Sequence, residues 1–377
     1  MEKTSIQKLG EFGQSAWLDN ISRDLIKSGN LHRLIGKGLL GMTSNPTIFD
    51  KAISQSSDYD KRLVELANDN KTAFEIYDEL TIKDIQDAAD ILKSVYEKSS
   101  GKDGYVSLEI NPMLAMKTQE TIEEGKRLFK KVNRSNVMFK VPATEPGFLA
   151  IEEFLSNGMN INITLIFSVQ QYVNTVKSYI RGLRKFSNKA LDLSGVRSVA
   201  SIFVSRIDTA IDKRIDEVIS RETSKEKKDK LSLLKGKAAV ANSWLVYKKW
   251  IKLFSSVEFE EVAKKGANKQ RILWASTGTK NPAFSDIMYI TELIAPDTVN
   301  TMPESTFNAF LDHGNVVNAV PSNFDGAKDV LSELGMYGIN INNICNELLE
   351  AGLVSFENSF NSLLSTIEQK ANTMSKV

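Results

Sequence analysis

Cysteine and histidine are scarce in this chain of 377 residues, and each shortage excludes a class of site. The single cysteine, Cys345, excludes an intramolecular disulfide and any zinc site built from several cysteines. The two histidines, His32 and His313, have no second histidine at metal-ligand spacing and no serine or cysteine signature beside them. We therefore expect no metal site, no other cofactor and no histidine-based triad, and one unpaired cysteine fits a cytoplasmic location.

An excess of one charge and a long apolar run are missing too. The chain has 48 Lys and Arg residues against 47 Asp and Glu, so its formal net charge is +1. This balance gives no electrostatic reason to expect nucleic acid or an anionic membrane as a partner. No run of about 18 apolar residues occurs, and the first residues, MEKTSIQKLGEFG, lack the apolar core of a secretory signal. We expect no association with a membrane.

Proline and glycine are few, with 8 and 21 residues, whereas apolar residues make up 42% of the chain. Such a composition can bury a sizeable core and is not that of a disordered segment. Length alone would allow two domains, but single α/β barrels commonly have about 250 residues and exceed roughly 400 with insertions, so length leaves the domain count open.

What the chain does contain is a regular succession of short strands and longer helices. Strands are predicted where apolar and polar residues alternate, and helices where apolar residues recur every three or four positions. The eight predicted strands cover residues 15–19, 39–45, 104–112, 137–142, 160–167, 197–206, 271–276 and 299–303. The predicted helices cover residues 21–28, 57–99, 117–132, 147–155, 169–186, 207–254 and 326–376, with the charged run at 221–230 as a solvated interruption.

This order of elements predicts one α/β domain, residues 1–377, built as a (β/α)8 TIM barrel with additional helical insertions. The barrel covers residues 15–310, and the C-terminal helices of residues 311–377 are expected to pack on the barrel wall. An open, doubly wound parallel sheet is the alternative. Polar residues near the C-terminal ends of the predicted strands, on their less apolar face, favour the barrel. These residues are Asp19, Asn45, Glu109, Lys140, Asn162, Thr164, Ser201 and Ser276.

Lys140 has the clearest chemical consequence. It lies between Phe139 and Val141, and the alternation turns its side chain away from the apolar face of the strand. Burial disfavours the ammonium form, and a neutral amine can attack a carbonyl to form a Schiff base. Read alone, the same residue also fits an ordinary lysine paired with a carboxylate on a sheet.

Schiff-base chemistry needs proton transfers, and carboxylates are the natural acids and bases where histidine is lacking. Glu109 and Asp19 are the two candidates, although each also fits a salt bridge or a helix cap. The side chains of Asn45, Asn162 and Ser201 can bind the hydroxyl groups of a polyol, although an asparagine beside a proline also fits a turn or cap.

A phosphate site is predicted after the sixth and seventh strands. The segment STGTKNP, which contains Ser276 and Lys280, supplies small residues, backbone donors and a cation, and Arg206 supplies a second cation. Barrels often bind phosphate near the loops that follow their last strands.

Six segments, in this order, resemble the transaldolase family: TSNPTIF, SLEINP, FKVPAT, NINITLIFS, SIFVSRID and WASTGTKNP. The match covers roughly residues 15–310, and the helical insertions and tail are similar to those of the longer subfamily. The resemblance implies an α/β barrel of the pentose phosphate pathway. Such an enzyme moves a dihydroxyacetone unit from sedoheptulose 7-phosphate to glyceraldehyde 3-phosphate and gives erythrose 4-phosphate and fructose 6-phosphate.

The resemblance also implies roles for individual residues. Lys140 is the Schiff-base lysine. Glu109 with Thr164 holds the catalytic water, and Asp19 takes the proton from the sugar hydroxyl during cleavage. The implied binding residues are Thr43, Asn45, Asn162 and Ser201 for the dihydroxyacetone unit and Arg206, Ser276 and Lys280 for phosphate. Shorter transaldolases have an arginine after the seventh strand where this chain has Lys280, which binds phosphate as a point charge without the bidentate fork.

Two other functions stay open beside transaldolase activity. An enzyme of the fructose 6-phosphate aldolase type would release free dihydroxyacetone instead of transferring it. A barrel without catalysis would keep only the sugar-phosphate pocket. Sugar phosphates are the expected partners in each case, and the sequence leaves open whether the chain is a monomer or a homodimer.

Overall fold

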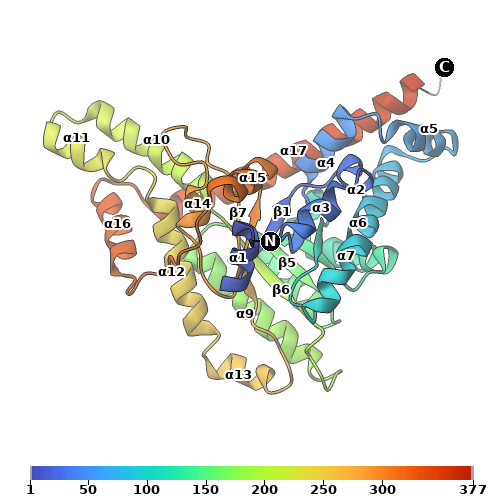
Figure 1. Ribbon diagram of the computed structural model, residues 1–377, viewed down its shortest axis with the longest axis horizontal. Helices are drawn as coiled ribbons and strands as arrows, with labels where there is room; N and C mark the ends of the chain where they lie inside the picture. The colour runs from blue at the N-terminus through green and yellow to red at the C-terminus, as the bar shows by residue number, and fades with distance from the viewer. Residues whose placement is uncertain (1, 375–377) are drawn as a thin grey trace.

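Residues 2–374, which the structure describes, contain a closed barrel of eight parallel strands. In this computed structural model each strand pairs with the next in chain order, and β8 pairs with β1 (Figure 1). The predicted (β/α)8 barrel is therefore confirmed, and the open doubly wound sheet is wrong. The strands are β1 (Gln14–Asp19), β2 (Gly41–Thr43), β3 (Val106–Glu109), β4 (Val137–Pro142), β5 (Ile161–Ile166), β6 (Ser198–Phe203), β7 (Arg271–Ala275) and β8 (Thr298–Met302).

Helices surround the barrel and extend beyond it on both sides (Figure 1). They are α1 (Ser5–Phe12), α2 (Arg23–Lys27), α3 (Asn30–Gly36), α4 (Pro46–Gln55), α5 (Asp60–Asn68), α6 (Ala73–Lys98), α7 (Thr118–Val132), α8 (Glu145–Leu155), α9 (Val169–Phe186), α10 (Ser205–Arg221), α11 (Lys225–Ser232), α12 (Ala238–Leu253), α13 (Val257–Ala263), α14 (Met288–Thr291), α15 (Glu304–His313), α16 (Asp325–Met336) and α17 (Ile341–Met374), with a 3₁₀ helix η1 (Pro112–Leu114).

The longer predicted helices agree with the structure, and several short ones were missed. The helix predicted for 169–186 has those bounds, whereas the one predicted from residue 21 begins at Arg23 because the Ser22 hydroxyl accepts a hydrogen bond from the Leu25 amide. The sequence reading did not foresee α1, α3, α4, α13, α14, α15 or η1. The charged run at 221–230, expected to be a solvated face or a loop, forms for the most part the solvent-facing α11.

The register of the strands places the predicted polar residues at one level of the lumen. Glu109 of β3 pairs with Lys140 of β4, and Lys140 pairs with Asn162 of β5. One step further along, Thr164 pairs with Pro142. Because neighbouring strands lie about 4.8 Å apart, these paired positions bring their side chains into mutual contact range.

The opposite, N-terminal end of the lumen is filled by a buried polar cluster. The Asp103 carboxylate accepts hydrogen bonds from the Ser15 hydroxyl at 2.8 Å and the Trp17 indole N–H at 3.0 Å. It also forms an ion pair of 3.0 Å with Arg271. Each member of the cluster thus gains a partner that compensates for lost water, and this end of the barrel is structural rather than open.

Strand β5 departs from the predicted alternation near its end. Regular alternation would put Leu165 on the same face as Ile161 and Ile163, but the register of β5 against β6 shifts between Ile163 and Ile166. Leu165 lies in this bulge with φ of +57°, a conformation that non-glycine residues rarely adopt. Its side chain contacts Gly352 of α17.

The C-terminal helix α17 packs at one end of the barrel. It packs against α4, α5, α6, α10, η1 and β5, elements that gather at the C-terminal end of the strands. In Figure 1 it runs across the top of the molecule and beyond α4. The helix therefore covers part of the face on which barrel enzymes carry their chemistry.

Residues 2–374 include no helix that is both long enough and apolar enough to cross a membrane.

Gly41 offers a test of the packing inside the lumen. A Cβ atom at this position would lie 2.6 Å from the Trp17 indole ring, which is fully buried and cannot move aside. We expect Gly41→Ala to lower the free energy of unfolding by about 1–3 kcal/mol through overpacking. Urea unfolding followed by circular dichroism measures the change.

Gly335→Ala is the matched control. This glycine lies in α16, and a Cβ there would meet no atom within 4 Å. Since alanine is the better helix former, we expect its free energy of unfolding to rise by up to about 1 kcal/mol. Equal effects of the two substitutions would contradict the close packing of Gly41 on Trp17.

Candidate active site

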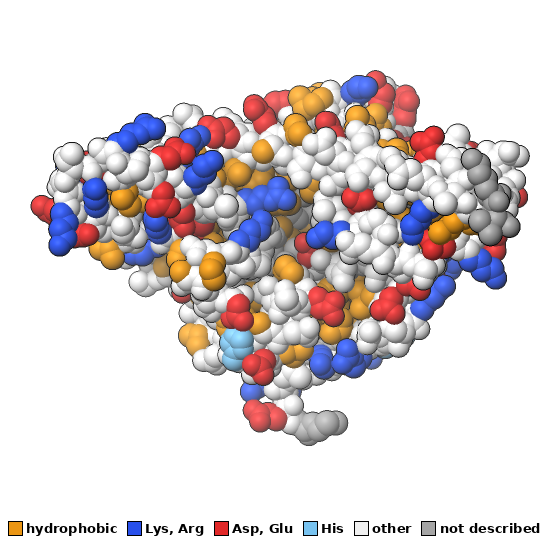
Figure 2. Space-filling model, turned by 90° about the horizontal axis from the view of Figure 1, so that it is seen from above, with side chains coloured by type: hydrophobic (Ala, Val, Ile, Leu, Met, Phe, Trp, Pro, Cys, Tyr) orange, Lys and Arg blue, Asp and Glu red, His pale blue; other side chains and the backbone are white. Residues whose placement is uncertain are grey.

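A cavity of about 320 Å³ opens at the C-terminal end of the barrel. Figure 2, which looks at the molecule from above, shows lysine and arginine side chains around a hollow in the middle of this face. Its lining comes from seven strands or their following loops and from the helices α10, α15 and α17. The lining residues are Asp19, Thr43, Asn45, Lys140, Thr164, Ser201, Phe203, Arg206, Ala275, Ser276, Gly278, Thr279, Lys280, Thr301, Pro303, Ser305, Thr306 and Phe356.

Lys140 projects from β4 into this cavity and is only 5% exposed. Its Nζ donates a hydrogen bond of 3.0 Å to the Ser44 carbonyl and lies 3.1 Å from Glu109 Oε2. The centroid of the Phe356 ring lies 5.9 Å from the same nitrogen. The amine is thus held between a carbonyl, a carboxylate and an aromatic face, and the expectation that its side chain turns into the lumen is met by the geometry.

Glu109 lies at the end of β3 beneath the cavity and is 5% exposed. Burial raises the pKa of Glu109, and the nearby Lys140 charge only partly opposes this effect. Despite its short distance to Nζ, Oε2 has no hydrogen-bond partner of good geometry among residues 2–374. A carboxylate with a raised pKa next to an amine is suited to taking up and returning a proton.

Asp19 ends β1 and lines the cavity. Burial raises its pKa, whereas the charges of Lys140 and Arg206 and a hydrogen bond from Thr43 oppose the rise. The Thr43 hydroxyl donates to Asp19 Oδ1 at 2.7 Å and lies 2.7 Å from the Thr301 hydroxyl. These bonds fix the direction of the carboxylate at the wall of the cavity, where it can act as a base.

The three residues predicted to bind hydroxyl groups differ in which of their hydrogen-bonding groups are not already used within the protein. Asn162 uses both of its side-chain groups within the protein, since its amide nitrogen donates to Ser107 Oγ at 3.0 Å and its oxygen accepts from Ser201 at 2.6 Å. Asn45 caps α4 by accepting from the Ile48 amide at 3.0 Å, so its amide nitrogen is left to donate. Ser201 and Asn45 line the cavity directly, and Asn162 lies below them.

Thr164 is fully buried on β5 beside the bulge and lines the cavity. Its hydroxyl, like Glu109 Oε2, has no hydrogen-bond partner among the described residues. Buried polar groups are almost always satisfied. Two such groups at the site of one amine indicate a place where a small polar molecule binds.

Two cations face the cavity from the segments that follow strands β6 and β7. Arg206 lies in the first turn of α10, and Lys280 follows β7. Burial lowers the pKa of each, and the positive charge of Arg206 lowers that of Lys280 further. The segment after β7 is linked to the start of α10 by a hydrogen bond, because the Ser276 hydroxyl lies 3.0 Å from the Ser205 hydroxyl. Two like charges close together are unfavourable without an anion, so this corner of the cavity fits a phosphate.

All eleven predicted site residues lie in or directly beneath the cavity. Nine line it, and the other two, Glu109 and Asn162, contact lining residues from below. Of the other lining residues, Gly278 and Thr279 belong to the predicted phosphate segment. The sequence reading missed the remaining ones, which are Phe203, Ala275, Thr301, Pro303, Ser305, Thr306 and Phe356. Phe203 and Thr301 could have been found from their inward positions on predicted strands, whereas no pattern distinguished Phe356 from other apolar residues of the tail. Within residues 2–374 no group of His, Cys, Asp or Glu side chains is arranged to hold a metal ion.

Comparison with known proteins gives a consistent result. Residues 16–367 match the family model described as Transaldolase/Fructose-6-phosphate aldolase. A protein named Transaldolase from Trichodesmium erythraeum is 43% identical over 380 aligned positions that cover both chains completely. A protein named Transaldolase 2 from Nostoc sp. is 44% identical, and the alignment covers 98% of each chain. A protein named Transaldolase 2 from Streptomyces coelicolor is also 44% identical, and the alignment covers 97% of this chain and 96% of the other. The chain belongs to the transaldolase/fructose-6-phosphate aldolase family.

Proposed function

We propose that this chain is a transaldolase that transfers a dihydroxyacetone unit from sedoheptulose 7-phosphate to glyceraldehyde 3-phosphate through a Schiff base on Lys140. The observation that carries the proposal is the buried Lys140 amine, 3.1 Å from the Glu109 carboxylate, in a cavity with Arg206 and Lys280 at its rim. The matched family includes both kinds of enzyme, and the names of the relatives support transfer over release of free dihydroxyacetone.

In the first step the ketone carbon of the donor is attacked by the neutral Lys140 amine. The raised pKa of Glu109 supports its role as the group that takes the ammonium proton and returns it when water leaves the carbinolamine. We place the water of this step between Glu109 and Thr164, since both have a buried oxygen without a hydrogen-bond partner in the described residues. One water would satisfy both oxygens.

In the second step the bond between C3 and C4 of the ketose breaks. The C4 hydroxyl loses its proton to Asp19, the aldose phosphate leaves, and the electron pair of the broken bond is delocalised onto the imine nitrogen. Thr43 holds the Asp19 carboxylate in place through its 2.7 Å hydrogen bond. The reverse steps add the dihydroxyacetone unit to the acceptor aldehyde, with Asp19 returning the proton.

The remaining residues bind the substrate in this proposal. Asn45 and Ser201, supported from below by Asn162, bind hydroxyl groups of the dihydroxyacetone unit. The phosphate lies between Arg206 and Lys280, and the start of α10 adds the positive end of a helix dipole. A cytoplasmic location, a single domain in which the C-terminal helices belong with the barrel, and a monomer or homodimer complete the proposal.

Trapping with borohydride tests the covalent step. Reduction in the presence of fructose 6-phosphate is expected to fix one reduced dihydroxyacetone unit on Lys140, located by peptide mass spectrometry. Lys140→Ala should form no adduct, while Lys264→Ala, at a side chain that is 72% exposed, should form as much as wild type. An adduct of equal yield in Lys140→Ala would rule out this mechanism.

The acid limb of the pH–rate profile tests Asp19. Because burial raises the pKa of Asp19 and the base must be deprotonated, activity should fall with decreasing pH already above the ordinary range of aspartate, near 4. Thr43→Val removes a hydrogen bond to the charged form, so the limb should move up by about one pH unit. Thr43→Ser keeps the hydroxyl, so its acid limb should match that of the wild type. If Thr43→Val leaves the acid limb at the wild-type pH, the limb reports the titration of a group other than Asp19.

Charge removal tests the phosphate corner. Arg206→Met is expected to lower kcat/KM for fructose 6-phosphate by roughly 100-fold or more, since a charge-assisted contact to phosphate is lost. Lys280→Met should have the smaller effect, because lysine contributes a point charge from a more exposed position. Unphosphorylated fructose provides the control substrate. Equal losses for the phosphorylated and unphosphorylated sugars would place the phosphate elsewhere.

A further inference from the structure

The cavity is closed on one side by a residue from outside the barrel. Phe356 lies in the middle of α17, is 4% exposed, lines the cavity and has its ring centroid 5.9 Å from Lys140 Nζ. It is an apolar ring among polar and charged groups, so its contribution at this point is to exclude water from the amine. This arrangement needs α17 to be held in one position.

Two contacts on the face of α17 that carries Phe356 fix the position of this helix relative to the barrel. One turn before Phe356, a Cβ at Gly352 would lie 2.9 Å from Leu165 Cδ2, so the helix approaches the β5 bulge closely. One turn after it, the Phe360 ring packs edge-on against Tyr77 of α6 with centroids 5.1 Å apart. Residues spaced by four lie on one face of a helix, and Phe356 is therefore fixed between two packed neighbours.

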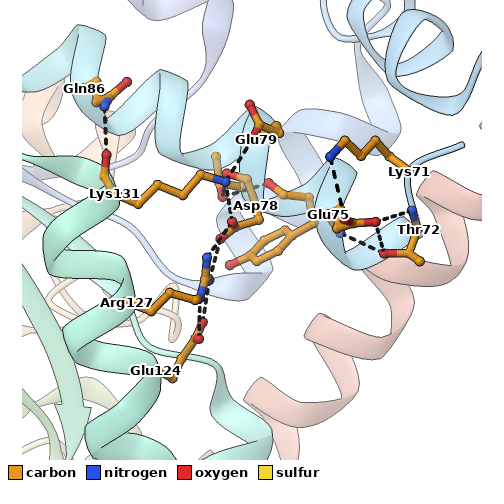
Figure 3. A network of polar contacts seen from close by, with 11 residues as sticks. Lys71, Thr72, Glu75, Asp78, Glu79, Gln86, Glu124, Arg127 and Lys131 are labelled. Carbon is orange, nitrogen blue, oxygen red and sulfur yellow. Dashed lines mark hydrogen bonds and ion pairs between the residues drawn. The ribbon is translucent and has the colours of Figure 1, made fainter. Parts of the chain in front are cut away.

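The part of α6 that receives Phe360 is itself held by an ionic network (Figure 3). Asp78, next to Tyr77, accepts two hydrogen bonds of 2.8 Å from Arg127 and one of 2.7 Å from Lys131, both on α7. The Asp78 side chain is 6% exposed, and the charges of Arg127 and Lys131 hold its pKa below the ordinary value against the effect of burial. A bidentate pair with a partly buried carboxylate is a rigid connection.

The far end of α17 is fastened as well. Lys370 Nζ donates to the carbonyls of Ile53 and Ser56, at 2.9 and 3.1 Å, and forms an ion pair of 2.7 Å with Asp60. These contacts join α17 to the end of α4 and the start of α5. The cover over the cavity is thus anchored on both sides of Phe356.

We propose that Phe356 is a specificity-determining residue that keeps water away from the dihydroxyacetone unit bound to Lys140, so that an aldehyde accepts this unit and water does not. The inference rests on the proposed function. After cleavage the unit is an enamine on the lysine nitrogen. Its hydrolysis consumes one water: one hydrogen goes to the enamine carbon, the oxygen becomes the ketone oxygen, and the other hydrogen goes to nitrogen as the carbon–nitrogen bond breaks. Free dihydroxyacetone and the amine result.

The experiment measures two products from fructose 6-phosphate. Free dihydroxyacetone is assayed without an acceptor, and sedoheptulose 7-phosphate is assayed with erythrose 4-phosphate as acceptor. The ratio of the two rates does not depend on how much of the enzyme is folded. We expect Phe356→Ala to raise the ratio of release to transfer by about tenfold or more, because the ring that excludes water is lost.

Two further variants make the result decisive. Phe356→Leu keeps an apolar side chain and should give a smaller increase, which can be measured even if Phe356→Ala fails to fold. Val354→Ala, on the same helix at a residue that is 54% exposed, should leave the ratio unchanged. Wild-type ratios in both Phe356 variants would overturn the proposal.

Failure of the proposed function would look different. In that case the wild-type chain would form neither sedoheptulose 7-phosphate nor a borohydride adduct, so no ratio could be measured for any variant. Transfer by the wild type, with an unchanged ratio in both Phe356 variants, would leave the proposed function intact and reject only the role of Phe356.

Discussion

The ion pair between Lys140 and Glu109 inside the barrel is the interaction on which the rest of the site depends. Each charge loses most of its water there, and an ion loses several kcal/mol on such transfer even after relaxation. The 3.1 Å contact and the hydrogen bond to the Ser44 carbonyl compensate for this loss. For Glu109 these interactions do not fully compensate for the lost hydration, because burial still raises its pKa. In the proposed mechanism this raised pKa suits Glu109 to accept a proton beside the attacking amine.

Such a pair has to be held by a rigid frame, and the register of a parallel barrel supplies one. Glu109, Lys140 and Asn162 are direct neighbours across β3, β4 and β5. The hydrogen bonds from Asn162 to Ser107 and from Ser201 to Asn162 continue the same layer toward β6. At the other end of the lumen the Asp103–Arg271 pair fills the space without opening it to solvent. The functional groups thus belong to the interior packing of the fold, and small shifts of one strand would move several of them together.

Most of this site could be predicted from the sequence because it lies on strands. A period of two tells which residues face inward, and the carboxyl ends of parallel strands meet at one edge, so Lys140 and Asp19 could be placed together from their local patterns alone. The same rule failed at Leu165, where a bulge reverses the alternation without any glycine to signal it. It also could not separate Phe356 from Phe360. Both belong to one apolar stripe of a helix, and only the tertiary packing shows that one ring faces Lys140 and the other faces Tyr77.

The distribution of charge in the cavity has a consequence for the order of binding and chemistry. Arg206 and Lys280 line the cavity with pKa values lowered by burial and, for Lys280, by the neighbouring cation, whereas burial raises the pKa values of the acidic groups Asp19 and Glu109. A phosphate between the two cations would relieve their repulsion and point the other end of the sugar toward the lysine. In the proposed reaction the phosphorylated aldose leaves after cleavage together with its charge, while the dihydroxyacetone unit stays bound by its covalent bond and by hydrogen bonds to its hydroxyl groups. That uncharged intermediate must outlast the exchange of one aldose phosphate for another. A cover that remains in place during this exchange has to come from a part of the chain that does not hold the phosphate, and α17, fastened to α4, α5 and α6, meets this requirement.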